Sequence, residues 1–185
     1  MSHAYKNFWS LNTDEAVVTG ILRGSTEKNT EVLMPINAQM KDIDLVLYNI
    51  ENRKNITIQV KWSRAYEPKK SEVKKYWDGS AGWFFLKKDT IHKSTADYFI
   101  FLIYVLEEDI GIWRRFIVPH TLTIPTRDLC DLSLKYKKLS KDERYNFFFW
   151  INPKKKTAID FRDELFDLTP YLDGNGFSIL NTELR

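Results

Sequence analysis

The chain has 185 residues, of which 43% are hydrophobic and 15% aromatic, so it suits one domain with a sizeable core and is too apolar for a disordered segment. A formal net charge of +3 permits a polyanionic partner without requiring one. The single cysteine, Cys130, excludes an intramolecular disulfide and a zinc site built from several thiolates.

Two segments bear on cellular location. Residues 1–10 are too polar for the apolar region of a signal peptide, and the longest apolar run, residues 98–106, is too short to span a bilayer. A lone cysteine also fits a reducing compartment. We therefore expect a cytoplasmic protein without a membrane partner.

The first predicted elements are a helix and a short strand. Residues 11–23 predict the helix, with Asn12 as N-cap, Glu15 three residues later as in a capping box, and Gly24 at the end. Glu15 lies in an otherwise apolar stripe, where an isolated carboxylate is costly unless it has a partner. Residues 31–36 predict the strand, which leads into a hairpin.

The hairpin is predicted from residues 42–47 and 56–62, which a polar turn separates. Alternation in the second strand places one set of side chains toward a core: Ile56, Ile58, Val60 and Trp62. Gln59 and Lys61 then lie on the opposite face. In the first strand Asp42 and Asp44 share a face that can lie beside them.

The rest of the chain predicts a basic loop or broken helix followed by further strands. Residues 63–82 are polar and basic, whereas residues 98–106 are continuously apolar, as in a strand covered on both faces. Residues 113–119 and 145–151 predict two more strands. Residues 160–185 predict a short helix and a turn at Gly174-Asn175-Gly176.

No internal repeat or linker marks a domain boundary, so we expect one domain over residues 1–185. The succession of elements predicts an α/β fold (α+β mixed), with a central mixed β-sheet flanked by helices.

An acid on one strand of a hairpin, with a Gln-x-Lys pattern on the next, resembles the PD-(D/E)XK nuclease superfamily. The matching residues are Asp44, Gln59 and Lys61. Ile43 stands where the family name has Pro, and Gln59 replaces the usual acid. The resemblance implies a restriction-endonuclease-like core of order α-β-β-β-α-β over about residues 11–119, with a C-terminal elaboration over about 120–185.

The resemblance also implies Mg²⁺-dependent hydrolysis of a phosphodiester, with Mn²⁺ as an alternative ion. Asp44 would be the central metal ligand, Gln59 would offer its amide oxygen, and Val60 its backbone carbonyl. Glu15 would add a second negative charge. Lys61 would face the scissile phosphate and stabilise negative charge there.

Basic residues directly after the second hairpin strand are the candidates for binding nucleic acid: Arg64, Lys69, Lys70, Lys74 and Lys75. DNA is preferred over RNA because members of the superfamily act mostly on DNA, and a homodimer would supply two sites for the two strands of a duplex. Two further lysine groups are left without a role: Lys135, Lys137, Lys138 and Lys141, and Lys154 to Lys156.

Other interpretations of the same residues stay open. Asp42 competes with Asp44, and either can be an exposed polar residue on a half-buried strand. Glu15 can serve the helix terminus instead of a metal. Because Gln59 removes a charge from the site, the alternative function is a catalytically inactive nuclease-fold module that binds nucleic acid or a protein partner.

Overall fold

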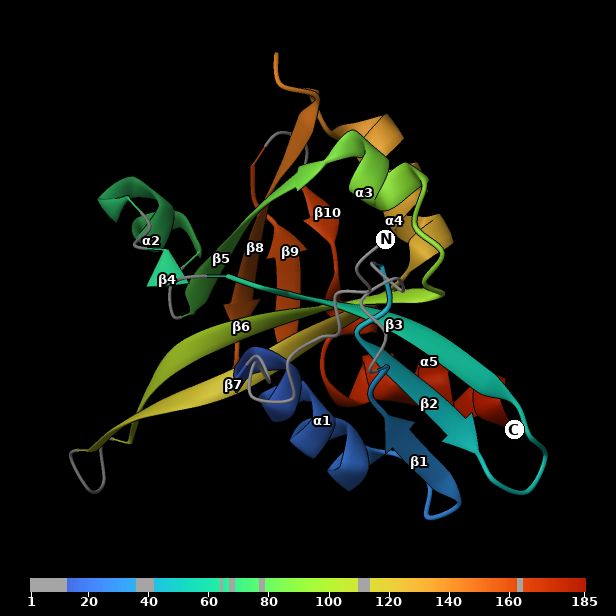
Figure 1. Ribbon diagram of the computed structural model, residues 1–185. Helices are drawn as coiled ribbons and strands as arrows, with labels where there is room; N and C mark the ends of the chain where they lie inside the picture. Colours follow the sequence, from blue (N-terminus) through green and yellow to red (C-terminus); the bar gives the residue numbers. More distant parts are fainter. Residues whose placement is uncertain are drawn as a thin grey trace.

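A computed structural model describes residues 13–35, 42–63, 65–66, 69–76, 79–109, 114–162 and 165–185, which form a mixed α/β structure with two five-stranded sheets (Figure 1). The first sheet has the order β1-β2-β3-β6-β7, with bounds β1 Thr30–Leu33, β2 Leu45–Asn49, β3 Asn55–Trp62, β6 Tyr98–Asp109 and β7 Arg114–Pro125. The second has the order β10-β9-β8-β5-β4, with bounds β4 Ala65–Tyr66, β5 Ser80–Lys87, β8 Arg144–Asn152, β9 Thr157–Asp160 and β10 Phe166–Asp167. The expected mixed α/β fold with a mixed sheet is confirmed, but helices alone cover only one face of that sheet, and the second sheet packs on the other.

The first sheet combines both strand orientations. Strands β1, β2 and β3 are antiparallel neighbours, β3 pairs with β6 in parallel, and β6 and β7 form a long antiparallel hairpin. A parallel pair requires a crossover connection. Here the connection from β3 to β6 contains β4, α2 (Lys70–Tyr76), β5 and α3 (Lys88–His92), so two strands of the second sheet lie within it.

One face of the first sheet packs against helices α1 (Thr13–Ser25) and α5 (Gly174–Leu184), which come from opposite ends of the described chain. Leu45 is paired with Ile58 and Leu47 with Ile56, and all four side chains are buried on this face. The predicted alternation of β3 therefore holds along this apolar stripe, although Trp62 at its end is exposed.

Strand β6 explains why residues 98–106 are continuously apolar. Ile100 and Leu102 join the core under α1 and α5, whereas Phe99, Phe101 and Ile103 join a second core between the sheets. All of these side chains are at most 1% exposed. The prediction of a strand covered on both faces is confirmed.

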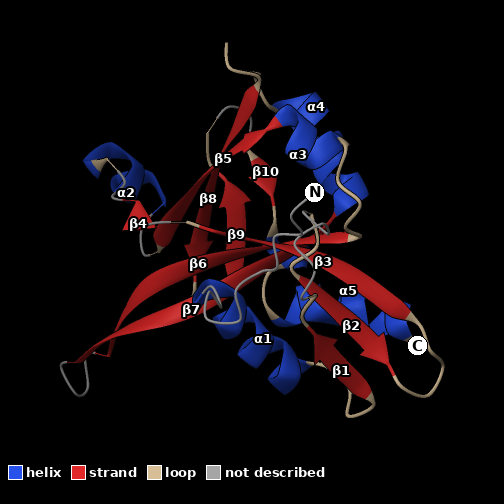
Figure 2. Cartoon of the chain, in the orientation of Figure 1, coloured by secondary structure: helices blue, strands red, loops and turns tan. Residues whose placement is uncertain are grey.

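The second core is closed by α3 and α4 (Thr126–Tyr136), which lie together at one end of the second sheet (Figure 2). A fully buried ion pair joins Lys137, just after α4, to Asp160 at the end of β9. The chain then passes through the short 3-10 helix η1 (Thr169–Tyr171) into α5. Among the described helices, none combines the length and the apolar composition needed to cross a bilayer.

Candidate functional site

Two hydrogen bonds hold Asp44 against the backbone of β3, one through its own amide and one through its carboxylate. Its amide donates to the Ile58 carbonyl oxygen at 2.8 Å, and its Oδ2 accepts from the Val60 amide at 2.8 Å. Continuing the β2–β3 register by one residue places Asp44 opposite Gln59. The backbone therefore fixes the Asp44 carboxylate beside the two residues of the predicted motif, Gln59 and Lys61.

Gln59 is buried and its amide oxygen has an unmet hydrogen-bonding capacity. The side chain is 3% exposed, and Oε1 has no hydrogen-bond partner within the described structure. A buried polar atom of this kind costs free energy unless a donor or a cation satisfies it. Gln59, which lies opposite Asp44 in the hairpin register, thus has an amide oxygen whose hydrogen-bonding capacity is unused.

Lys61 lies in an acidic, partly desolvated environment. Burial of the ammonium lowers the pKa of Lys61 below its ordinary value. Three carboxylates are close enough to oppose that change through their charge, in decreasing order Asp44, Asp42 and Glu15. Because the side chain is only half-buried, the ammonium is near these acids and can still meet a ligand from solvent.

Glu15 lies in the first turn of α1, on the same line as the buried residues Val18 and Leu22. Its side chain is 7% exposed, and its charge acts on Lys61 in the hairpin. The expected N-cap, Asn12, lies outside the described residues, so the capping-box interpretation of Glu15 stays open. Glu15 therefore lies on the buried side of α1, near enough to the hairpin for its charge to act on Lys61.

The structure therefore brings Asp44, directly before β2, together with Gln59 and Lys61 of β3, and Glu15 of α1 is near enough for its charge to act on Lys61. Within the described ranges, no group of three or more His, Cys, Asp or Glu side chains is arranged to hold a metal ion. A metal here would depend on the Gln59 amide and on a backbone carbonyl as well as on carboxylates. The expected Val60 carbonyl ligand stays a prediction, since the contact seen for Val60 is through its amide.

The predicted nucleic-acid lysines lie on a different part of the molecule. Arg64 is outside the described residues, whereas Lys69 directly precedes α2 and three others lie in it: Lys70, Lys74 and Lys75. Helix α2 is anchored to the second sheet, because Tyr76 Oη donates to the Phe161 carbonyl oxygen at 3.3 Å and Glu72 pairs with Arg162 at 2.8 Å. These lysines are exposed beside the second sheet, and their role stays a prediction.

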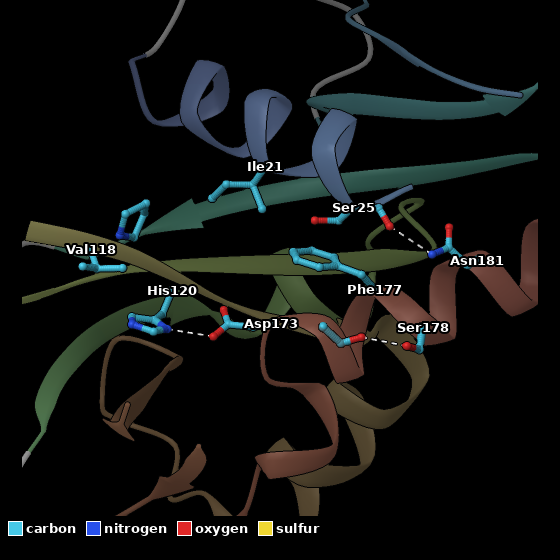
Figure 3. Close-up of a pocket in the computed structure, with 10 residues that line it drawn as sticks. Ile21, Ser25, Val118, His120, Asp173, Phe177, Ser178 and Asn181 are labelled. Carbon is cyan, nitrogen blue, oxygen red and sulfur yellow. Dashed lines mark hydrogen bonds and ion pairs between the residues drawn. The ribbon is translucent and has the colours of Figure 1, made fainter. Parts of the chain in front are cut away.

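A second cluster of ionisable groups was not predicted from the sequence. His120 of β7 places Nδ1 2.7 Å from Asp173 Oδ2 and Nε2 3.0 Å from Glu107 Oε1. It borders a pocket of about 540 Å³ between the first sheet, α1 and the start of α5, where Figure 3 shows His120 directed at Asp173. The three residues are 13 and 53 positions apart, so no local motif indicates their meeting.

His120 serves as a link and has no nitrogen left for catalysis. Burial lowers the pKa of His120, but hydrogen bonds with Asp173 and Glu107 outweigh burial and raise it above its ordinary value. Both ring nitrogens face carboxylates, which favours the imidazolium form as a double donor. We assign this cluster to holding β6, β7 and α5 together.

Comparison of the chain with models of protein families, with curated proteins and with solved structures gives no match.

Proposed function

We propose that this protein is a Mg²⁺-dependent nuclease that hydrolyses phosphodiester bonds, with DNA preferred over RNA as the substrate. The observation that supports this most strongly is the position of Asp44, whose Oδ2 accepts from the Val60 amide between Gln59 and Lys61. Asp44 lies opposite Gln59 and acts through its charge on Lys61, at the end of the hairpin away from its turn. Phosphodiester hydrolysis needs this combination of hard oxygen donors and a cation.

The order of elements supports a restriction-endonuclease-like core. Helix α1 is followed by three antiparallel strands and then, after the crossover, by β6 as the parallel partner of β3. The added strands β4 and β5 leave this sheet and pair in the second one. In this proposal the second sheet is an elaboration on a core formed by α1, β1, β2, β3 and β6.

The donor set fits a small divalent cation such as Mg²⁺ or Mn²⁺. Asp44 and Gln59 would hold it, with the Val60 carbonyl as a third ligand and Glu15 as a second negative charge. The buried Gln59 Oε1, which has no hydrogen-bond partner within the described structure, is the observation that favours a cation here. When bound, such an ion neutralises charge on the phosphoryl oxygens and activates a water molecule.

Lys61 contributes a positive charge at the reacting phosphate. Its ammonium is partly desolvated, which strengthens its interaction with a phosphoryl oxygen relative to the same contact in water. Asp44 and Glu15 favour the charged form of Lys61. We therefore assign Lys61 to stabilising the negative charge that develops in the transition state.

A second candidate function is a nuclease-fold module without turnover that binds nucleic acid or a protein partner. The residue that favours it is Gln59, because a neutral amide attracts a divalent cation less than the carboxylate it replaces. The two functions differ in whether substrate is cleaved.

The test is incubation with supercoiled plasmid, single-stranded DNA, branched DNA and RNA, each in Mg²⁺ or Mn²⁺. We expect wild-type protein to cut at least the DNA substrates, and Lys61→Ala and Asp44→Ala to lose at least about 100-fold in rate while keeping the wild-type melting temperature within a few degrees. Lys28→Ala, which removes an exposed lysine between α1 and β1, is the matched control and should cut normally.

Equal cleavage by wild type and Lys61→Ala would contradict the proposed mechanism. Absence of cleavage on every substrate, together with retained binding, would favour the inactive module.

A further inference from the structure

The outer face of the second sheet exposes an aromatic surface. Four cross-strand pairs of β5 and β8 point away from the core between the sheets: Ala81–Trp150, Trp83–Phe148, Phe85–Asn146 and Lys87–Arg144. Helix α2 covers the first pair through Tyr76, which lies 5.5 Å from Trp150 between ring centroids. Beyond α2, Trp83 is 47% exposed and Phe85 39% exposed. We call Trp83, Phe85 and Phe148 the aromatic platform.

Ring packing and hydrogen bonds hold Trp83 of the platform in place. The rings of Trp83 and Phe148 are parallel to within 2°, with centroids 6.0 Å apart, and Trp83 Nε1 donates to Asn146 Oδ1 at 3.0 Å. The Trp83 backbone is held by Ser63, whose Oγ accepts from its amide at 2.7 Å and donates to its carbonyl oxygen at 3.0 Å. Large aromatic rings held in this way lose little entropy when a flat ligand stacks on them.

The charge of this face favours an anionic partner. The Arg144 guanidinium lies 4.8 Å from the centroid of Phe85. That of Arg162, whose charge is offset by its pair with Glu72, lies 4.0 Å from the centroid of Phe148. None of the eight outward residues in the four pairs is acidic, and two are cationic, Lys87 and Arg144. Aromatic rings interleaved with cations suit single-stranded nucleic acid, because bases stack on the rings and phosphates meet the cations.

A cationic pocket lies beside the end of this sheet face that α2 covers. It has a volume of about 340 Å³, and its lining includes Lys75, Lys155, Asn152 and Thr157 but no acidic residue. Trp150 lines this pocket and pairs with Ala81 of β5. Ala81 is two residues, or about 7 Å, along β5 from Trp83. Two ammonium groups with an amide and a hydroxyl are suitable partners for a backbone phosphate.

We infer that the outer face of the second sheet binds single-stranded nucleic acid by stacking bases on Trp83, Phe85 and Phe148, with a backbone phosphate near Lys75 and Lys155. This inference extends the proposed function by naming the class of polymer, and it gives Lys75 a role on the surface where α2 places it. Binding here requires neither metal nor cleavage, so the two proposals can fail separately.

The experiment measures binding of fluorescein-labelled oligothymidylate and oligouridylate of about 15 nucleotides by anisotropy, in EDTA at low salt. Wild-type protein should bind at least one of the two, and the two probes separate DNA from RNA. Trp83→Leu and Phe85→Ala should each weaken binding about tenfold, whereas Trp83→Phe, which keeps a ring, should retain most of it.

Phe116→Ala is the matched control, since Phe116 is an aromatic residue of β7 with 43% exposure away from this face. It should bind within about twofold of wild type. Melting temperatures identify any variant that fails to fold. If Trp83→Leu is one of them, binding by Trp83→Phe is compared with wild type instead, and it should be mostly retained.

Three results would overturn the inference. The first is no binding of either probe at low salt, and the second is binding that Trp83→Leu and Phe85→Ala leave unchanged. The third is self-association of wild-type protein in sedimentation that Trp83→Leu abolishes, which would assign this face to a second copy of the chain. Loss of cleavage in Lys61→Ala with unchanged oligonucleotide binding in EDTA would leave the inference standing.

Discussion

At the scale of single residues, the candidate site depends on the balance of charge around Gln59. Asp44, Asp42 and Glu15 all act on Lys61, yet the residue nearest the centre of the motif is a neutral, buried amide. An acid at this position would add a negative charge. That charge would strengthen the binding of a cation, and without a cation it would destabilise the fold. Substituting Gln59 therefore tests whether the cluster is built around a cation.

Gln59→Glu should lower stability without metal and increase the response to metal. A buried carboxylate next to Asp44 should cost about 3 kcal/mol in EDTA, and Mn²⁺ should recover most of that loss because binding to the folded state stabilises it. The measurement is thermal unfolding of wild type and variant in EDTA and in a Mn²⁺ series.

Asn55→Asp, which adds the same charge at an exposed position of β3, is the control and should show no extra response to Mn²⁺. If Mn²⁺ shifts the melting temperatures of wild type and Gln59→Glu equally, the cluster has no special affinity for the ion.

At the scale of elements, α5 and the β6–β7 hairpin are joined through His120. Asp173, directly before α5, also accepts from the Thr121 amide at 2.8 Å through its second oxygen. The Asp173 carboxylate thus binds both the backbone and the imidazole of β7. The charge state of His120 should therefore influence how firmly α5 is attached.

Stability should depend on pH through His120. Because its folded-state pKa is raised above 6.5, the stabilisation is fully present below pH 6.5 and is lost as pH rises through the folded-state pKa. His120→Gln should lower the free energy of unfolding by about 2 kcal/mol at pH 6, and by less at pH 9. Urea unfolding at both pH values measures this difference.

His92→Gln is the comparison, since the partners of His92 are the hydroxyl groups of Ser133 and Tyr145. A difference between wild type and His120→Gln that stays constant from pH 6 to pH 9 would show that the imidazolium does not contribute.

Periodicity predicts elements well where one face, or both, is apolar. It finds the β2–β3 hairpin and β6, because buried apolar side chains alternate along the hairpin strands and run continuously along β6. It misses β5, whose outward residues Trp83 and Phe85 are aromatic instead of polar, so the strand shows no alternation. The same exposed rings form the proposed binding surface, which explains why a surface strand has an apolar sequence.

Tertiary contacts decide the positions that local sequence does not. The predicted turn at Gly174-Asn175-Gly176 is wrong, because these residues form the first turn of α5. A Cβ on Gly176 would lie 2.4 Å from the Tyr171 carbonyl oxygen, so the glycine permits close approach of the chain here. Lys137 belongs to a lysine-rich segment, but its buried partner Asp160 is 23 residues away.

Three of the four candidate site residues could be predicted from local sequence, and the position of the fourth depends on tertiary packing. Alternation and the family resemblance select Asp44, Gln59 and Lys61, and the hairpin register places them together. The position of Glu15 depends on how α1 packs on the sheet, which its sequence indicates only through one acid in an apolar stripe. No local sequence pattern predicts the His120 cluster, because its members are far apart in the sequence and only the fold brings them into contact.

At the scale of the whole molecule, the candidate metal site and the proposed nucleic-acid-binding surface lie on different sheets. The hairpin and α1 hold the candidate metal site, while the outer face of the second sheet holds the aromatic platform and α2. Ser63 connects them, because it lies two residues after Lys61 and binds the backbone of Trp83. Nucleic acid bound to the platform would therefore contact Trp83, which Ser63 joins to the end of β3 just after Lys61.

In the proposed site, Asp44 and Gln59 hold a divalent cation beside Lys61. Anomalous diffraction from crystals grown in Mn²⁺ tests it most directly, with Asp44→Asn crystals as the comparison. We predict one strong peak within about 2.5 Å of a carboxylate oxygen of Asp44 and of Gln59 Oε1, weakened or lost in Asp44→Asn. A well-ordered wild-type crystal with Mn²⁺ bound elsewhere, or with no peak at Asp44 in millimolar Mn²⁺, would contradict it.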